Sequence, residues 1–265
     1  MLYGLYQSAQ GATVQARRLE TTAHNLANAG TTAFKPDVTV VRTVPQFEQR
    51  LAFEQRLGQV FDRLRQPRLA DDRGLGNHNG ATAVADVVTD FSNGSVRPTG
   101  NTFDVAIAGP GFFRVGGADQ SYLTRNGSFV VGPEGVLRTA DTGLPVLDPA
   151  SKEIVLPLDA ADVGIGADGL ITDRLATIAN IDVVEAVDES ALTKLGDSLY
   201  AADVEVRDID PNRTRLIQGH LEASGTEPMA EMTAMIEVTR AFEMNMTMVQ
   251  TQDQSLGRLL QMAAA

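Results

Sequence analysis

The sequence predicts an α+β protein in which N- and C-terminal heptad helices form a coiled-coil pair and an antiparallel all-β domain is inserted between them. At both ends of the 265-residue chain, apolar residues recur at alternating spacings of three and four, a repeat typical of coiled coils. Between the ends, short alternating stretches separated by turn residues indicate strands. The expected domains are a helical domain (1–30 with 225–265), a connecting segment (31–80) and the β domain (81–224).

The first helix is expected from about residue 2 to residue 27. Its repeat contains only Leu and Ala, so a partner helix can approach its backbone closely. Asn28 or Gly30 is expected to stop the helix, because both residue types adopt the left-handed backbone conformation. The expected assembly positions of this helix are Leu2, Leu5, Ala9, Ala12, Ala16, Leu19, Ala23 and Leu26.

The last helix is expected over residues 229–260 and continues the heptad repeat. Methionine occurs on both faces of this helix, which indicates that several helices surround it, because thioether side chains adapt to irregular pockets. An acidic residue on the repeat, Asp253, needs a partner if it is buried. The expected assembly positions are Met232, Met235, Thr239, Phe242, Met246, Val249, Asp253, Leu256 and Leu260.

The connecting segment contains a strand signal, a helix signal and a boundary. Residues 38–44 are rich in valine and are expected to form a strand. Residues 45–66 contain a short Phe-Glu-Gln-Arg-Leu repeat, which predicts a helix packed either on its own chain or against a neighbouring subunit. Residues 67–80 have no periodicity and are rich in turn formers, so they mark a boundary.

The β domain shows short strands with turn signals at Asn93-Gly94, Asn126-Gly127 and Asp168-Gly169. Such dipeptides between alternating stretches indicate an antiparallel arrangement. The expected strands are Val84–Phe91, Phe103–Ile107, Phe112–Val115, Tyr122–Thr124, Ser128–Val131, Val136–Leu137, Ile154–Leu156, Ile178–Val184 and Leu216–Ala223.

Composition excludes several classes of protein. The formal net charge is −12, and an acidic chain argues against nucleic-acid binding, which needs clustered basic residues. The absence of cysteine excludes disulfides and thiol chemistry. No stretch approaches the ~18 consecutive apolar residues of a membrane span. The N-terminus has no basic region followed by an apolar core, so we expect no Sec-type signal peptide.

We expect no catalytic, cofactor or metal site, and the sequence gives no positive reason to expect an enzyme. The histidines His24, His78 and His220 show no metal-ligand spacing. Residues 208–212 begin like a calcium loop but lack its later glycine and glutamate. No nucleophile-elbow or His-Glu-x-x-His pattern occurs.

The run from Asn25 to Lys35, Asn-Leu-Ala-Asn-Ala-Gly-Thr-Thr-Ala-Phe-Lys, resembles the signature of the flagellar rod and hook proteins. Ala33 departs from that signature, which usually has glycine at this position. The blocks 104–107, 109–113, 125–129 and 221–224 extend the resemblance, as do residues 235–244. The matching signature residues are Asn25, Leu26, Ala27, Asn28, Thr31, Phe34 and Lys35.

The resemblance implies a structural subunit of the bacterial flagellar basal-body rod that polymerises into the axial drive shaft. The paired helices would form the inner tube and the β domain would project outwards. Residues 228–232 and 242–246 look most like the proximal rod proteins, with distal rod or hook subunits as alternatives. The implied partners are other copies of itself, other rod proteins and the flagellar export apparatus. Type III export would bring the protein to the periplasm-spanning rod.

Two alternatives lie outside this family. A secreted β-rich enzyme with helical ends would need a convergent polar site in the β domain. An amphipathic membrane-surface protein would need Lys and Arg on the polar faces of its helices. The composition of the last helix argues against the second alternative, because it contains more acidic than basic residues. The basic ones are Arg240 and Arg258, and the acidic ones are Glu231, Glu237, Glu243 and Asp253.

Overall fold

The chain has a helix at each end and mostly antiparallel β structure between them, which confirms the expected α+β class. The computed structural model describes residues 2–44, 81–117, 120–157, 163–173, 176–201, 205–209 and 213–263. Two compact units make up the chain. The helical unit comprises residues 1–23, 38–88 and 232–265, and the β-rich unit comprises residues 24–37 and 89–231.

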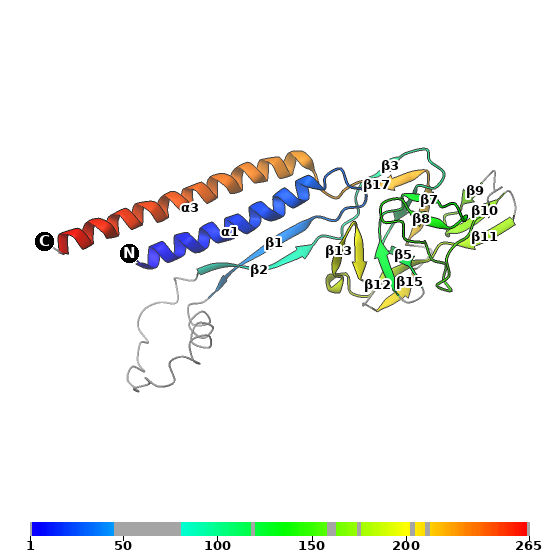
Figure 1. Cartoon of the computed structure of the whole chain (residues 1–265), viewed down its shortest axis with the longest axis horizontal. Helices are drawn as coiled ribbons and strands as arrows, with labels where there is room; N and C mark the ends of the chain where they lie inside the picture. Colours follow the sequence, from blue (N-terminus) through cyan, green and yellow to red (C-terminus); the bar gives the residue numbers. More distant parts are fainter. Residues whose placement is uncertain are drawn as a thin grey trace, which may run out of the picture. The chain divides into compact units, whose positions relative to one another are not determined.

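The helices are α1 (Leu2–Ala27) and α3 (Pro228–Ala263). Proline suits the first position of α3, where no helical hydrogen bond needs its missing N–H. Within the helical unit, α1 and α3 lie side by side and antiparallel (Figure 1). A Cβ added to Gly4 would lie 3.0 Å from Nε2 of Gln252, and one added to Gly11 would lie 2.8 Å from Oδ1 of Asn245.

Strands β1 (Asp37–Val44) and β2 (Ala81–Thr89) form a two-stranded sheet. The strand expected over residues 38–44 is therefore confirmed. The strand expected from residue 84 pairs with β1, and most of β2 belongs to the helical unit. The Thr39 hydroxyl donates to the Thr21 hydroxyl of α1 over 2.9 Å. The helix expected over residues 45–66 lies outside the described residues.

A six-stranded antiparallel sheet organises the β-rich unit, in the order β13-β14-β6-β5-β12-β15. Its strands are β5 (Phe112–Gly116), β6 (Ser121–Thr124), β12 (Val183–Ala186), β13 (Lys194–Gly196), β14 (Leu199–Ala201) and β15 (Val206–Asp208). A short 3-10 turn, η1 (Glu189–Ala191), follows β12.

Smaller sheets complete this unit. The three-stranded sheet has the order β11-β10-β9, from β9 (Val163–Ile165), β10 (Leu170–Asp173) and β11 (Ala176–Asn180). The two-stranded pairs are β16-β4, β17-β3 and β7-β8. Their strands are β3 (Val96–Pro98), β4 (Val105–Ala108), β7 (Phe129–Val131), β8 (Leu137–Thr139), β16 (Arg215–Gln218) and β17 (His220–Glu222).

Hydrophobic cores form on both faces of the six-stranded sheet. Successive strand residues point to opposite faces, so Phe112 of β5 enters one core and Phe113 enters the other. Val184 and Val183 of β12 divide in the same way. Burial on both faces explains why each of these strands begins with two adjacent apolar residues, Phe112-Phe113 and Val183-Val184.

Three expected strands differ in the structure. The stretch 178–184 is divided between β11 and β12, which lie in different sheets. The stretch 216–223 is divided between β16 and β17 at Gly219, whose φ of 70° turns the chain. The stretch 154–156 forms only an isolated bridge, between Val155 and Val136.

Candidate functional site

The signature segment 25–35 begins in the last turn of α1 and belongs to the β-rich unit together with Asp37. Asn25 is buried and binds both polar groups of the Asp37 backbone. Its Nδ2 donates to the Asp37 carbonyl over 2.9 Å, and its Oδ1 accepts from the Asp37 N–H over 2.9 Å. Its Nδ2 also lies 3.2 Å from Oε1 of Glu231, in the first turn of α3.

Asn28 makes only local bonds. Its Nδ2 donates to the His24 carbonyl over 2.9 Å, and its Oδ1 accepts from the Thr31 hydroxyl over 3.2 Å. The first of these bonds reaches a backbone carbonyl in the last turn of the helix, where intrahelical donors run out. Neither Asn28 nor Gly30 has a positive φ. The expectation that one of them stops α1 in the left-handed conformation is therefore wrong.

Within the signature segment, Ala33 adopts the left-handed backbone conformation, with φ of 55°. It is completely buried, and its N–H donates to the Glu222 carbonyl of β17 over 2.9 Å. A residue with a Cβ is strained in this conformation, whereas glycine is not. This geometry gives a physical reason for the glycine of the family signature.

Phe34 anchors the segment by its aromatic ring and is almost fully buried. The His24 ring meets it edge-on, with 5.6 Å between ring centroids. Nζ of Lys194 lies 4.9 Å from the ring centroid, a cation–π arrangement. Lys194 also bonds to Asp37 over 2.6 Å and to the Lys35 carbonyl over 2.6 Å.

Lys35 enters a buried charge cluster with Glu222 and Arg125. Its Nζ lies 2.7 Å from Oε1 of Glu222 and donates to the Ser92 carbonyl over 2.7 Å. Nε of Arg125 lies 3.5 Å from the other carboxylate oxygen, and its guanidinium donates to the Gly109 carbonyl over 2.8 Å. Burial lowers the pKa of Lys35, and the positive charge of Arg125 acts in the same direction.

This cluster joins three blocks that lie far apart in the sequence. Each of its charged residues stands in a stretch that carries the family resemblance: 25–35, 125–129 and 221–224. Breaking a buried ion pair is costly because it leaves an uncompensated charge. The lysine, arginine and glutamate of these blocks therefore have a structural role in the β-rich unit.

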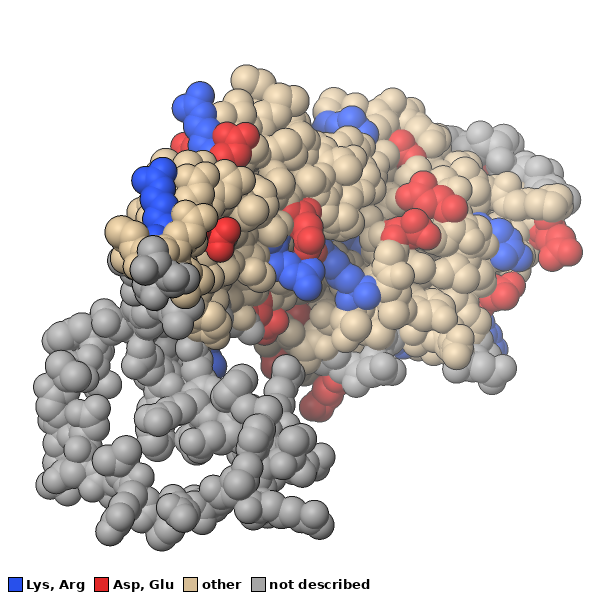
Figure 2. Space-filling view, turned by 60° about the vertical axis from the view of Figure 1, so that its left-hand side comes forward, with Lys and Arg blue, Asp and Glu red and all other residues tan. Residues whose placement is uncertain are grey.

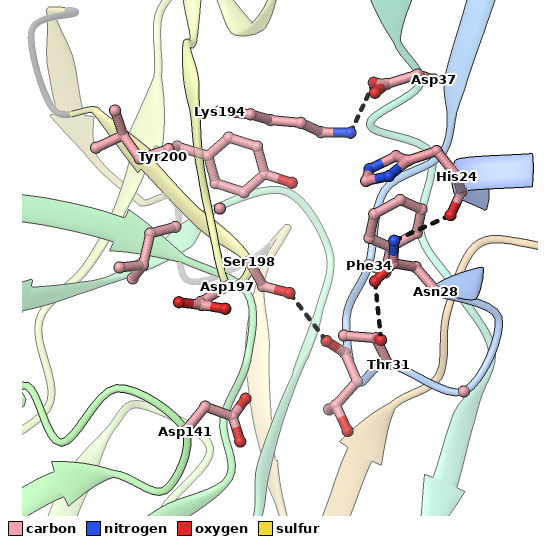
Figure 3. Close-up of a pocket in the computed structure, with 15 residues that line it drawn as sticks. His24, Asn28, Thr31, Phe34, Asp37, Asp141, Lys194, Asp197, Ser198 and Tyr200 are labelled. Carbon is pink, nitrogen blue, oxygen red and sulfur yellow. Dashed lines mark hydrogen bonds and ion pairs between the residues drawn. The ribbon is translucent and has the colours of Figure 1, made fainter. Parts of the chain in front are cut away.

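A groove of about 790 Å³ lies between the signature segment and the β13–β14 hairpin (Figure 3). Lys194 spans it to reach Asp37, and the Ser198 hydroxyl lies 3.4 Å from the Thr32 carbonyl. Burial raises the pKa of Tyr200, which lines the groove, above its ordinary value. The bonds across this groove hold the segment against the hairpin.

Sequence reasoning did not select several residues of this site. Asp37, Lys194 and Glu231 bind the signature segment, but none of them stands in a recognisable local pattern. Glu222 and Arg125 could have been found, because both stand in the resembling blocks and both are charged residues in an expected β domain.

The structure places the expected assembly positions of α1 on two different sides. Leu5, Ala12, Leu19 and Leu26 are buried or half-buried, and so is Ala16. Ala9 and Ala23 are exposed, while their neighbours Ser8 and Thr22 are covered. The side chain of Leu2 is not among those that the structure describes.

The same shift of one residue occurs in α3. Met235, Phe242, Val249 and Leu256 are half-buried, as is Thr239. Met232, Met246, Asp253 and Leu260 are exposed, and Val238, Asn245 and Gln252 are more covered. The amides of Asn245 and Gln252 lie over Gly11 and Gly4, which have no side chain to exclude them. Asp253 is therefore not a buried seam residue in the single chain.

Charge is unevenly divided between the two units. The β-rich unit holds 11 Lys and Arg against 24 Asp and Glu, a net of −13, whereas the helical unit holds 11 against 10. On the face shown in Figure 2, basic side chains lie singly or in small groups among acidic ones. That face offers no basic patch for a nucleic-acid backbone.

Two features are absent from the described part of the chain. No group of three or more His, Asp or Glu side chains there could hold a metal ion. Among the described helices, none is long and apolar enough to cross a membrane.

Family models match two parts of the chain. The flagellar basal body rod FlgEFG protein C-terminal model matches residues 217–262, which include most of α3. The flagellar hook protein FlgE/F/G D1 domain model matches residues 106–173, which lie in the β-rich unit.

Individual proteins match most of the chain. The flagellar basal-body rod protein FlgF of Caulobacter vibrioides is 33% identical over 227 residues, which cover 86% of this chain and 84% of the relative. The flagellar basal-body rod protein FlgG of Agrobacterium fabrum is 32% identical over 261 residues, covering 93% and 94%. A FlgG from Buchnera aphidicola is 30% identical over 277 residues, covering 99% and 100%.

Proposed function

Because the chain belongs to the flagellar basal-body rod protein family, and is thus a structural subunit of the rod, we propose that it builds the proximal part of that rod. The sequences Pro-Met-Ala-Glu-Met (228–232) and Phe-Glu-Met-Asn-Met (242–246) support the proximal assignment, because they look most like proximal rod proteins. The distal rod is the alternative, since FlgG relatives align over nearly the whole chain.

Basal bodies from strains blocked at successive assembly stages distinguish the two positions. A tagged copy of a proximal subunit is present in rods that lack distal subunits. A tagged copy that appears only once the distal rod is built would contradict the proximal assignment and support the distal one.

Polymerisation is assigned here to the terminal helices. The domains that serve it are residues 1–30 with 225–265, joined through the segment 31–80 to the β domain 81–224, which would project outwards. A large apolar surface on α3 supports this role: Met232, Ile236, Met244, Met248, Leu260 and Met262 are all exposed in the single chain. Exposed apolar surface of this extent marks an interaction site.

The partners that fit this surface are other copies of the chain and other rod proteins, which would complete a coiled coil with the heptad positions of both helices. The observation that carries the proposal is the exposure of apolar side chains on both faces of α3: Met232, Met246 and Leu260 at heptad positions, and Met244 and Met248 on the opposite face. Delivery through the flagellar export apparatus would precede assembly.

Amide hydrogen exchange on the dilute monomer and on the assembled protein tests this role. Ordering a backbone costs roughly 1–2 kcal/mol per residue, and the single chain covers only part of α3. We expect weak protection of residues 2–23 and 232–263 in the monomer and strong protection after assembly. Protection in the monomer equal to that of the β-rich unit would refute the proposal.

A further inference from the structure

Four passages join the two units: the chain passes between them after residues 23, 37, 88 and 231. At each of these four crossings, one residue of the β-rich unit lies within two residues of the boundary. These residues are Asn25, Asp37, Thr89 and Glu231. Hydrogen bonds connect these four residues into one cluster, which we name the junction node.

Asn25 and Asp37 form the centre of the junction node. Two bonds of 2.9 Å link the Asn25 amide to the Asp37 backbone. Nδ2 of Asn25 lies 3.2 Å from Oε1 of Glu231, and the Thr89 hydroxyl donates to Oδ1 of Asp37 over 2.8 Å. Residues that are 12, 52 and 206 positions apart are thus bound together.

The node is also fixed to the six-stranded sheet. Lys194 of β13 binds Oδ1 of Asp37 over 2.6 Å, and it contacts the ring of Phe34. Asn25 is only 4% exposed, so its bonds are protected from competing water. Hydrogen bonds that include an ionised group are shorter and stronger than neutral ones.

We propose that the junction node fixes, within the β-rich unit, the four chain segments that lead to the helical unit, with Asn25 as its positioning residue. Four independent passages would let each segment move separately at its own end. With the four ends tied at one cluster, the directions in which the segments leave the β-rich unit depend on one another. This role explains why Asn25 of the signature binds residues far away in the sequence, whereas Asn28 binds only its near neighbours.

Distance measurement between two spin labels tests the proposal. The chain has no cysteine, so two exposed positions, Gln254 in the helical unit and Glu134 in the β-rich unit, can be replaced by labelled cysteines in the full chain. We expect Asn25→Ala to broaden the distance distribution relative to the parent. The matched control Asn28→Ala, which removes only local bonds, should leave its width unchanged.

A local readout accompanies the distances. The Asp37 amide, which donates to Asn25, should exchange about tenfold faster in Asn25→Ala, the effect of losing about 1.4 kcal/mol. Thr89→Val removes a different bond of the node and replaces Asn25→Ala if that variant does not fold. A width unchanged despite faster Asp37 exchange would overturn the proposal, as would equal broadening in Asn28→Ala.

Discussion

At the scale of single residues, Ala33 shows how a departure from a signature is accommodated. The family signature has glycine where this chain holds alanine at φ 55°. The left-handed conformation costs an L-residue roughly 1–2 kcal/mol, but a buried methyl group recovers part of that cost. The same fold is therefore compatible with either residue at position 33.

Substitutions at position 33 test this balance. Ala33→Gly should leave the free energy of unfolding within about 1 kcal/mol of the parent, because relief of strain offsets greater chain entropy and a lost methyl contact. Ala33→Val should lower it by about 2–4 kcal/mol, because a β-branched residue is both strained at positive φ and too large for a closed site. Urea unfolding measures both; equal values for the two variants would contradict the φ assignment.

The buried charge cluster gives a second prediction. Glu222→Gln should lower the free energy of unfolding by about 3–5 kcal/mol, because Lys35 and Arg125 then lose their shared counter-charge in a buried site. Lys35→Met should cost less, since Glu222 keeps Arg125 as a partner. Glu134→Gln, on an exposed turn, is the control and should change little. If the first variant unfolds like the control, the cluster contributes no stability.

Two aspartates are expected to change stability with pH in opposite directions. Burial raises the pKa of Asp182, and the nearby Arg114 opposes this only in part. The folded chain therefore binds a proton more readily than the unfolded chain. The contribution of Asp182 to stability should increase as pH falls from neutrality through its raised pKa towards its ordinary value.

Unfolding of Asp182→Asn and Asp188→Asn from pH 3 to pH 7 provides the measurement. The advantage of the parent over Asp182→Asn should grow as pH falls through the raised pKa. Hydrogen bonds from Ser190 lower the pKa of Asp188, so its contribution is present above the ordinary value and lost as pH falls below it. Parallel pH trends for the two variants would contradict these assignments.

At the scale of elements, α1 could be predicted to the residue and α3 to within three residues at each end, but their contact face could be predicted only in part. Of the sixteen expected assembly positions whose side chains are described, ten are covered, among them Leu19, Met235 and Phe242. Beside two of the exposed positions, Met246 and Asp253, the covered residue is one position earlier, because Gly11 and Gly4 leave room for the amides of Asn245 and Gln252. A pattern of apolar residues cannot predict such a helix contact, because the residues that meet there are glycine on one helix and Asn or Gln on the other.

Strands could be predicted where local signals coincide with pairing. The 168–169 turn does separate β9 from β10, and β5 matches its apolar run. Missed strands such as β13 and β15 are short and pair with distant partners. Their pairing depends on tertiary context more than on local composition. For the same reason Lys194 of β13 could not be assigned to the signature segment from sequence.

A pair of glycine substitutions tests the observed helix contact. Gly257 of α3 has open space around it, whereas Gly11 faces Asn245. Gly257→Leu should raise helix content, since leucine gains almost 1 kcal/mol over glycine. Gly11→Leu should lose that gain and about 1–3 kcal/mol more to overpacking. Circular dichroism and amide protection of α1 report both, and equal stabilisation would mean that the helices do not meet there.

At the scale of the whole molecule, charge decides how copies approach one another. Residues 1–73 have a net charge of +3 and residues 74–265 a net charge of −15, which suggests attraction between these unlike segments of two copies. The structural units have net charges of +1 and −13. Attraction between such unlike units is weak compared with repulsion between two β-rich units, because interaction energy scales with the product of the charges.

Assembly should therefore strengthen as salt is added. The screening length falls from about 30 Å at 0.01 M to about 8 Å at 0.15 M ionic strength, which weakens repulsion between β-rich units while apolar contacts of α3 persist. Light scattering should show a lower critical concentration at the higher ionic strength. Replacing exposed Glu134, Glu153 and Glu205 by Gln should make this dependence shallower. Assembly that weakens with salt would instead show that unlike charges on neighbouring copies drive association.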